Sequence, residues 1–309
     1  MPAVKDRKAN ELYLTRTYDA PVAAVWDAWT DPEKVAKWWG PRGFTITTHS
    51  KDLRVGGHWK YTMHGPDGKD WPNRTVYHEV EPRRKLVYDH GGTDDTPPLF
   101  RVTVYFREKD GKTTLDFTMA FKDAETAKNT KGFIKQANGD STWDRLAEYL
   151  EKHASGKEQF VIARSFHTDP DTMYSMWAEP RHLAKWLAPT GTTMEVRKGE
   201  VKEGAEMYYK MSGNGLTMYG RIAYRELKRP SRLVYTQQFL DEHDRIGRHP
   251  MLSVWVETML TTVKIVAEDE DHTRVTVTWE PDGKVSREEL EAFINLRSGM
   301  TMGWTGSFD

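Results

Sequence analysis

Apolar and polar residues alternate along short segments in the first half of the chain. Trp59, Tyr61 and Met63 share one face of such a segment, and Lys60 and Thr62 lie on the other. We expect seven strands in this region, at 12–18, 44–53, 58–64, 74–81, 85–90, 99–108 and 112–121. Turn-forming Gly, Pro and Asp residues separate most of them. One-sided strands joined by short turns predict a curved antiparallel sheet with a single apolar face.

Helical signals flank these strands. Two short helices are expected directly after the first strand, beginning at Pro21 and at Asp31-Pro32, since proline suits a first helical turn and aspartate caps it. Apolar residues at helical spacing predict a long C-terminal helix at 124–152. A sheet wrapped around this last helix buries both apolar faces, so the predicted fold class is α+β.

The chain repeats itself. Residues 12–41 align with residues 160–189 at a shift of 148 (160 − 12), and the register continues without a gap for about fifty residues. The matched pairs include Arg16 with Arg164, Trp29 with Trp177, Trp38 with Trp186, and Pro41 with Pro189. A repeat of this length indicates a duplicated domain. We therefore expect two tandem units, at 1–155 and 158–309.

The two copies differ in length at two places. The second copy carries about thirteen extra residues (160 − 147) within 237–259, which is long enough to suggest a lid or an interaction surface. At the end of the chain, Phe308-Asp309 aligns with Trp143-Asp144, so residues 145–153 have no counterpart. We expect the final helix of the second copy to be truncated.

Composition excludes several classes of protein. The chain has no cysteine, which excludes disulfides and thiol chemistry. Its 45 basic and 46 acidic residues leave a net charge of −1, which argues against nucleic-acid binding. No run of 18 apolar residues is present, and the N-terminus lacks the apolar stretch of a signal peptide. We expect a cytoplasmic protein that does not cross a membrane.

An ordered set of motifs resembles one known family. The set contains W-T-D-P followed by W-W-G-P, then D-L-R-V-G-G, E-P-x-x-x-L-V-Y and a late G-W-T-G-S-F-D. It is similar to the domain named after the activator of the Hsp90 ATPase (AHSA1), in the START-like, Bet v 1-like (SRPBCC) superfamily. The resemblance implies a helix-grip fold in each unit: a seven-stranded antiparallel sheet gripping a C-terminal helix, with a cavity between. The superfamily includes lipid carriers, hormone receptors, polyketide cyclases, antibiotic-sequestering proteins and co-chaperones.

Aromatic and methionine side chains on the predicted inner faces are the candidate ligand-binding residues. With 12 Trp, 13 Tyr and 11 Phe in the chain, they can line a wide apolar space as well as fill a core. In the first unit we select Trp59, Tyr61, Met63, His78, Tyr88, Phe117, Met119, Gly139 and Trp143. In the second unit we select Met207, Tyr209, Met211, Tyr235, Trp279 and Trp304. For any single residue, the alternative is a place in an ordinary core.

Gly139 is included because of a departure from the family pattern. The family's final helix carries Gly-Trp, which the second unit keeps as Gly303-Trp304, whereas the first unit has Asn138-Gly139. The missing tryptophan would leave the first unit with the larger cavity. Alternatively, Trp143 or Phe133 fills the space.

Charged and titratable residues give few chemical signals. Arg16 is expected to face inward from the first strand with Asp52 as its partner, as is Arg164 with Glu200 in the second unit. His58, His64, His78 and His90 show no metal-ligand spacing, so we expect neither a metal nor another cofactor. His78 is in phase with the inward positions of its predicted strand, which makes it the one candidate acid–base residue.

These features favour non-enzymatic binding of small hydrophobic or aromatic ligands in an internal cavity. One alternative is a cyclase- or hydrolase-like enzyme that uses a cavity acid–base. Another is a co-chaperone that acts on an Hsp90-type partner through its surface. An exposed sheet edge or the segment 237–259 could also support a homodimer.

Overall fold

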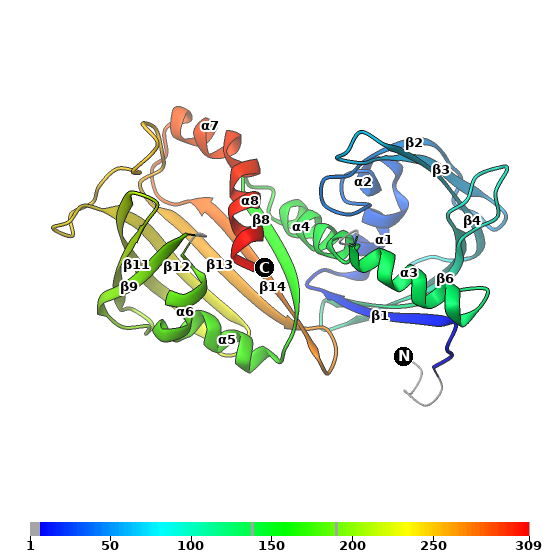
Figure 1. The fold of residues 1–309 in the computed structure, drawn as a ribbon, viewed down its shortest axis with the longest axis horizontal. Helices are drawn as coiled ribbons and strands as arrows, with labels where there is room; N and C mark the ends of the chain where they lie inside the picture. Colours follow the sequence, from blue (N-terminus) through cyan, green and yellow to red (C-terminus); the bar gives the residue numbers. More distant parts are fainter. Residues whose placement is uncertain (1–6, 137–138, 189–190, 309) are drawn as a thin grey trace. The chain divides into compact units, whose positions relative to one another are not determined.

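The computed structural model describes residues 7–136, 139–188 and 191–308. The chain forms two compact units, Met1–Ala154 and Ser155–Asp309, called unit one and unit two below. Each unit contains an antiparallel sheet together with its own helices (Figure 1). The predicted α+β class and the tandem arrangement are therefore confirmed.

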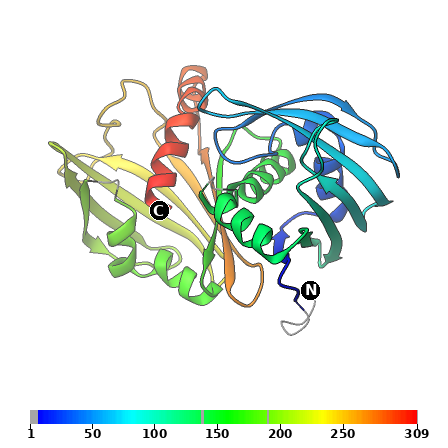
Figure 2. The ribbon, with the colours of Figure 1, turned by 45° about the vertical axis from the view of Figure 1, so that its right-hand side comes forward.

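Unit one is built on a seven-stranded sheet with the order β1-β7-β6-β5-β4-β3-β2. Its elements are β1 (Glu11–Tyr18), α1 (Val22–Thr30), α2 (Pro32–Val35), β2 (Thr45–Lys51), β3 (His58–His64), β4 (Asp70–Glu81), β5 (Lys85–His90), β6 (Phe100–Lys109), β7 (Lys112–Ala120), α3 (Ala124–Gln136) and α4 (Ser141–Ser155). The sheet curves around the helices, as Figure 2 shows. The side chains on its concave face therefore pack against the helices.

Unit two repeats this order with the sheet β8-β14-β13-β12-β11-β10-β9. Its elements are β8 (Phe160–His167), α5 (Pro170–Ala178), α6 (Pro180–Trp186), β9 (Thr192–Gly199), β10 (Glu206–Gly213), β11 (Leu216–Lys228), β12 (Arg232–Leu240), β13 (Met259–Ala267), β14 (His272–Pro281), α7 (Arg287–Asn295) and α8 (Arg297–Phe308). The extra segment between β12 and β13 takes part in the core, because Val256 is buried and the Trp255 ring lies 6.2 Å from that of Phe293.

The duplicated tryptophan motif fixes the two short helices to each other. The Trp38 indole N–H donates to the Ala28 carbonyl at 2.9 Å, and the equivalent Trp186 donates to the Met176 carbonyl at the same distance. In unit two the bond connects α6 to α5, and in unit one it connects the turn after α2 to α1. The conserved spacing of the motif in both copies therefore has a direct structural cause.

The single long helix predicted at 124–152 is wrong, since α3 and α4 are separate and the described residues Gly139 and Asp140 form a turn between them. Asn138 lies outside the described residues. The Gly139 N–H donates to the Ile134 carbonyl at 2.8 Å, a five-residue spacing typical of a helix end. Glycine also has a low helix propensity, which favours a break at this position.

The predicted partners of the inward arginines are also wrong. Arg16 is buried, but it donates to the Thr15 carbonyl at 2.9 Å and lies 3.5 Å from the Asp140 carboxylate. Asp52 pairs instead with Arg54 at 2.7 Å, and Glu200 lies 3.9 Å from Lys202. The reason is topological: β1 and β2 lie at opposite edges of the sheet.

Candidate functional site

The aromatic residues selected in unit one line the concave side of its sheet. Trp59, Tyr61, Tyr88 and Phe117 are each at most 3% exposed. The other in-facing residues, Met63, Met119 and Trp143, are partly buried. The rings pack closely, with 4.0 Å between the centroids of Trp59 and Tyr61 and 4.5 Å between those of Phe117 and Trp143. These side chains form one continuous aromatic interior.

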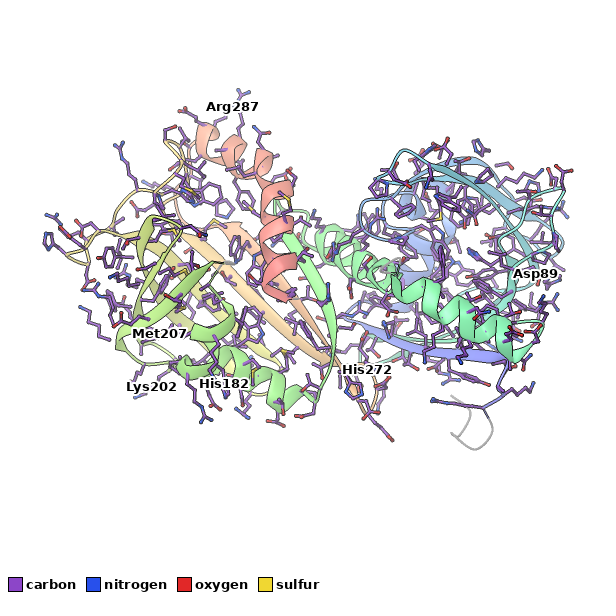
Figure 3. The ribbon with its side chains drawn as sticks, in the orientation of Figure 1. Asp89, His182, Lys202, Met207, His272 and Arg287 are labelled. Atoms are coloured by element: carbon purple, nitrogen blue, oxygen red, sulfur yellow. The ribbon has the colours of Figure 1, made fainter. Side chains whose placement is uncertain are left out.

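Unit two has a similar interior with more sulfur. Its selected residues Met207, Tyr209, Met211, Tyr235 and Trp304 are buried, and Trp279 is partly buried. Met207, labelled in Figure 3, is completely buried at the position that Trp59 occupies in unit one. The apolar interior is therefore common to both copies, although its composition differs.

Gly139 does not face a hole of aromatic size. A side chain at this position would meet Ile134 at 2.7 Å. Trp143 stacks on Trp29 at 5.8 Å and 29°, and Trp304 stacks on the equivalent Trp177 at 5.9 Å and 23°. Trp143 therefore occupies the place of Trp304, as the alternative interpretation expected, whereas Phe133 is 62% exposed.

The prediction that His78 faces the interior is wrong. A register shift between Tyr77 and Glu79 interrupts the pairing of β4 with β5, and Thr75 and Tyr77 are the buried residues on this strand. The His78 imidazole is on the outer face, 2.8 Å from the carboxylate of Asp89, which is labelled in Figure 3. A role as cavity acid–base is therefore excluded for His78.

His90 faces the interior of unit one, although it is not among the residues selected from the sequence. It follows Leu86 and Tyr88 on the inward phase of β5, so the alternation of this strand contained the signal. Its ring centroid lies 4.9 Å from that of Phe100 and 6.2 Å from that of Trp39. Burial is the only cause that lowers the pKa of His90, to about 4, so the imidazole is neutral at physiological pH.

Three tyrosines recur at equivalent places in the two interiors. In unit one they are Tyr61, Tyr77 and Tyr88, and in unit two they are Tyr209, Tyr224 and Tyr235. Burial raises the pKa of every one of them, to about 12 for Tyr209. These hydroxyls therefore stay protonated and act as hydrogen-bonding groups. Sequence reasoning missed Tyr77 and Tyr224, because the phase of β4 was assigned wrongly.

The polar groups of the two interiors are paired differently. In unit two, Gln237 is hydrogen-bonded to Tyr209 and accepts from the Thr261 hydroxyl at 3.0 Å, and Tyr235 is hydrogen-bonded to Thr261. In unit one, the Tyr61 hydroxyl accepts from the Trp39 indole at 3.2 Å. Within the part of the chain that the structure describes, the Tyr88 hydroxyl and the His90 ring have no hydrogen-bond partner.

Lys51 is a further unusual residue of unit one. Its ammonium lies 4.1 Å from the centroid of the Trp59 ring and donates to the Trp29 carbonyl at 3.0 Å, near the end of α1. Burial lowers the pKa of Lys51 to about 7, and the nearby Asp31 opposes this shift. A cation at the last turn of a helix stabilises that turn. Lys51 therefore belongs to the packing of α1.

An external cleft of about 390 Å³ also lies on unit one. It is lined by α1, by Arg83 and by the stacked rings of Tyr149 and His153. None of the in-facing sheet residues borders it. This cleft is therefore separate from the aromatic interior.

Neither a metal centre nor a membrane span is found in the described parts of the chain. No cluster of three or more His, Asp or Glu side chains in residues 7–136, 139–188 and 191–308 has an arrangement that could hold a metal ion. Over the same residues, no helix is both long and apolar enough to cross a bilayer.

The partly buried imidazole of His90 leads to a prediction about stability in acid. An unfolded histidine has a pKa of about 6.5, so between pH 6.5 and pH 4 the unfolded chain binds more protons at this residue than the folded chain does. Stability should therefore fall as the pH drops through this window and level off below it. The shift corresponds to about 3 kcal/mol, which partial exposure of the ring reduces to about 2 kcal/mol.

The measurement is urea denaturation of the wild type and of His90→Gln at pH 7 and pH 4.5. The wild type should lose more stability than the variant over this interval, by an amount close to the expected 2 kcal/mol. Glutamine stands at the equivalent place in unit two, so the fold accommodates it. Equal losses in the two proteins would contradict a neutral, buried His90.

The curved seven-stranded sheets and their C-terminal helices define the class of this protein: two helix-grip domains in tandem. Residues 19–151 and 167–309 match the family described as "Activator of Hsp90 ATPase homolog 1-like protein". The chain belongs to this family, with one copy in each unit.

Solved structures with similar folds cover either one unit or both. A protein of Nitrosomonas europaea is 21% identical, with a TM-score of 0.44, over 48% of this chain and 99% of that one. A protein of Mycobacterium smegmatis is 25% identical, with a TM-score of 0.43, over 47% and 93%. The di-domain ARO/CYC BexL from the BE-7585A biosynthetic pathway is 12% identical, with a TM-score of 0.40, over 96% and 95%. No curated protein matches the chain.

Proposed function

We propose that this protein binds small hydrophobic or aromatic ligands inside its helix-grip units and does not transform them chemically. The observation that carries the proposal is the aromatic interior of unit one, in which a few polar tips project among packed rings. Sites for small molecules have this composition, because apolar walls supply affinity and a few polar groups fix orientation. Membership in a family with a helix-grip fold supports the same function.

A catalytic role has less support than binding. A general base needs a proton to abstract and a second group that orients it, as in a histidine held by a carboxylate. Among the described residues, the His90 ring contacts aromatic rings and no carboxylate. His78 does have a carboxylate partner, but it lies on the outer face.

The test is a thermal-shift and native mass-spectrometry screen of the whole chain against small aromatic and aliphatic compounds. A ligand present at ten times its Kd should raise the Tm of the unit that binds it by roughly 3–6 °C. Native mass spectrometry should show a complex with one or two ligands per chain. If no compound shifts the Tm and none is retained, internal ligand binding is ruled out.

Two tryptophan variants test whether the ligand enters the interior of unit one. Met119→Trp adds volume on the inner side of β7 and should reduce the shift. Tyr105→Trp places the same ring on β6, where Tyr105 is 38% exposed, and should leave the shift unchanged. Equal shifts in both variants would place the ligand elsewhere.

A further inference from the structure

Two polar side chains of unit one project into the aromatic interior from adjacent inward positions. Tyr88 and His90 are two residues apart on β5, so they share one face of the sheet and their Cα atoms are about 7 Å apart. Tyr88 is 3% exposed, and the ring of His90 lies close to the rings of Trp39 and Phe100. A small molecule in this interior would meet both groups at once.

Neither group is satisfied by the described part of the protein. The Tyr88 hydroxyl and both nitrogens of the His90 ring lack a hydrogen-bond partner among these residues. Leaving a buried donor or acceptor unpaired is costly, and most buried polar groups in native proteins are paired. Neither side chain is among those of the described residues whose polar atoms are fully enclosed without a partner, so the Tyr88 hydroxyl and the His90 nitrogens are accessible to a small molecule.

In unit two the residues at the equivalent positions have hydrogen-bond partners. Tyr235 and Gln237 stand in place of Tyr88 and His90, and both are hydrogen-bonded within the unit. Thr261 provides the connecting hydroxyl, from the position opposite Tyr235 in the sheet. In unit one the residue opposite Tyr88 is Val102, which has no hydrogen-bonding side-chain atom. At this pair of positions, polar side chains without a hydrogen-bond partner therefore occur in unit one and not in unit two.

The hydrogen-bonding chemistry of Tyr88 and His90 indicates which class of ligand they would bind. A neutral imidazole presents one N–H donor and one acceptor nitrogen, and a tyrosine hydroxyl can do either. Burial shifts the pKa of His90, and burial together with Tyr61 and Tyr77 shifts that of Tyr88. Among the described residues, no charged group contributes to either shift. A carboxylate or ammonium would lose its hydration here without gaining a counter-charge. A hydroxyl group is uncharged and both donates and accepts.

We infer that Tyr88 and His90 form the recognition site of unit one for the hydroxyl group of an uncharged, phenol-like aromatic ligand. This inference rests on the proposed binding function and specifies it. The rings of Trp39 and Phe100 would contact the aromatic part of the ligand, and the hydroxyl would bridge the imidazole and the tyrosine. Unit two lacks this recognition site, because the equivalent residues Tyr235 and Gln237 are already hydrogen-bonded within the unit.

The experiment compares 2-naphthol, naphthalene and 2-naphthoate by isothermal titration calorimetry with the whole chain at pH 7. The three probes share one ring system and differ only in the polar group. We expect 2-naphthol to bind roughly tenfold more tightly than naphthalene, the usual gain from one or two neutral hydrogen bonds, and 2-naphthoate to bind more weakly than either. If 2-naphthol and naphthalene bind equally, ligand binding stands and the hydroxyl site is overturned. If none of the three binds while the wider screen finds other ligands, the hydroxyl site is overturned and the proposed function stands. If the screen finds no ligand either, both fail.

The double variant His90→Gln with Val102→Thr gives unit one the residues that form the hydrogen-bond network of Tyr235, Gln237 and Thr261 in unit two. The tenfold preference for 2-naphthol should fall to roughly onefold, while the Tm without ligand stays the same or rises. The matched control is His78→Gln, which makes the same change on the outer face and should keep the preference. An undiminished preference in a folded double variant would overturn the site. The wild-type comparison of the three probes decides the question even if the double variant does not fold.

Discussion

Replacing Trp143 by alanine is expected to destabilise unit one by about 3–5 kcal/mol. The indole stacks on Trp29, lies 4.5 Å from Phe117 and meets Trp39 edge-on at 6.3 Å, so its removal opens a cavity at the junction of α1, α4 and the sheet. Urea denaturation monitored by circular dichroism should show the unit-one transition at a lower midpoint. The unit-two transition should not move.

Three further variants test whether the loss of stability comes from the stacked position of Trp143. Trp304→Ala should destabilise unit two by a similar amount, because Trp304 has the equivalent stacking partner. Phe133→Ala removes an exposed ring and should change stability by less than about 0.5 kcal/mol. Gly139→Trp should not rescue Trp143→Ala, because a side chain at residue 139 collides with Ile134. Rescue by Gly139→Trp would show that the two tryptophans are not equivalent.

The equivalence of Trp143 and Trp304 explains where the sequence alignment failed. The shift between the copies is 160 at Leu115 and Val275, and 161 (304 − 143) at the two tryptophans. Matching the terminal Phe308 to Trp143 implied a shift of 165 (308 − 143), about one helical turn too far. A helical face repeats after one turn, so apolar spacing alone did not reveal the error. The stacked partners on the first helix of each unit decide the register.

The sequence predicted which side chains face the interior wherever apolar and polar residues alternate along a strand without interruption. The in-facing residues of β3 and β7 were identified from their two-residue period, and the same rule applied to β5 would have selected His90. It failed on β4, because the irregularity between Tyr77 and Glu79 reverses which side chains face inward. A β-bulge inserts one extra residue into a strand, so an alternation extended through it assigns the wrong face on one side of the bulge. The candidate histidine was therefore assigned to the wrong strand.

Comparison of the two copies shows which residues they share and where their interiors differ. Both keep the tryptophan that connects the short helices, the stacked tryptophan of the C-terminal helix and the three interior tyrosines. They differ at His90 and Val102, where unit two has Gln237 and Thr261. These exchanges change the pairing of polar groups and leave the fold intact, as expected if duplication preserved a stable unit while its interior diverged.

Arg145 of α4 bonds to the segment that carries Trp39, beside a second attachment in which Arg42 pairs with Glu148 and donates its backbone N–H to Ser141 at 2.9 Å. The Arg145 guanidinium donates to the carbonyls of Gly40 at 2.7 Å and Pro41 at 2.9 Å, with longer contacts to those of Lys37 and Trp39. Gly40 adopts a positive φ of 93°, which the contacts on either side of it help to hold. Arg145 thus holds in place the loop from which the Trp39 indole reaches Tyr61.

Arg145→Ala should therefore destabilise unit one by about 3–4 kcal/mol, since two strong charge-assisted bonds are lost and their carbonyl acceptors stay partly buried. It should also weaken ligand binding, because Trp39 borders the ring of His90. Arg145→Lys keeps the charge but lacks the planar fork, so it should recover only part of the loss. Arg84→Ala removes an exposed arginine and is the control, with an expected change below about 0.5 kcal/mol. Urea denaturation and 2-naphthol titration of the same variants test both effects. A stable Arg145→Ala protein would mean that the contacts of Arg42 with Glu148 and Ser141 are enough to hold the tryptophan loop.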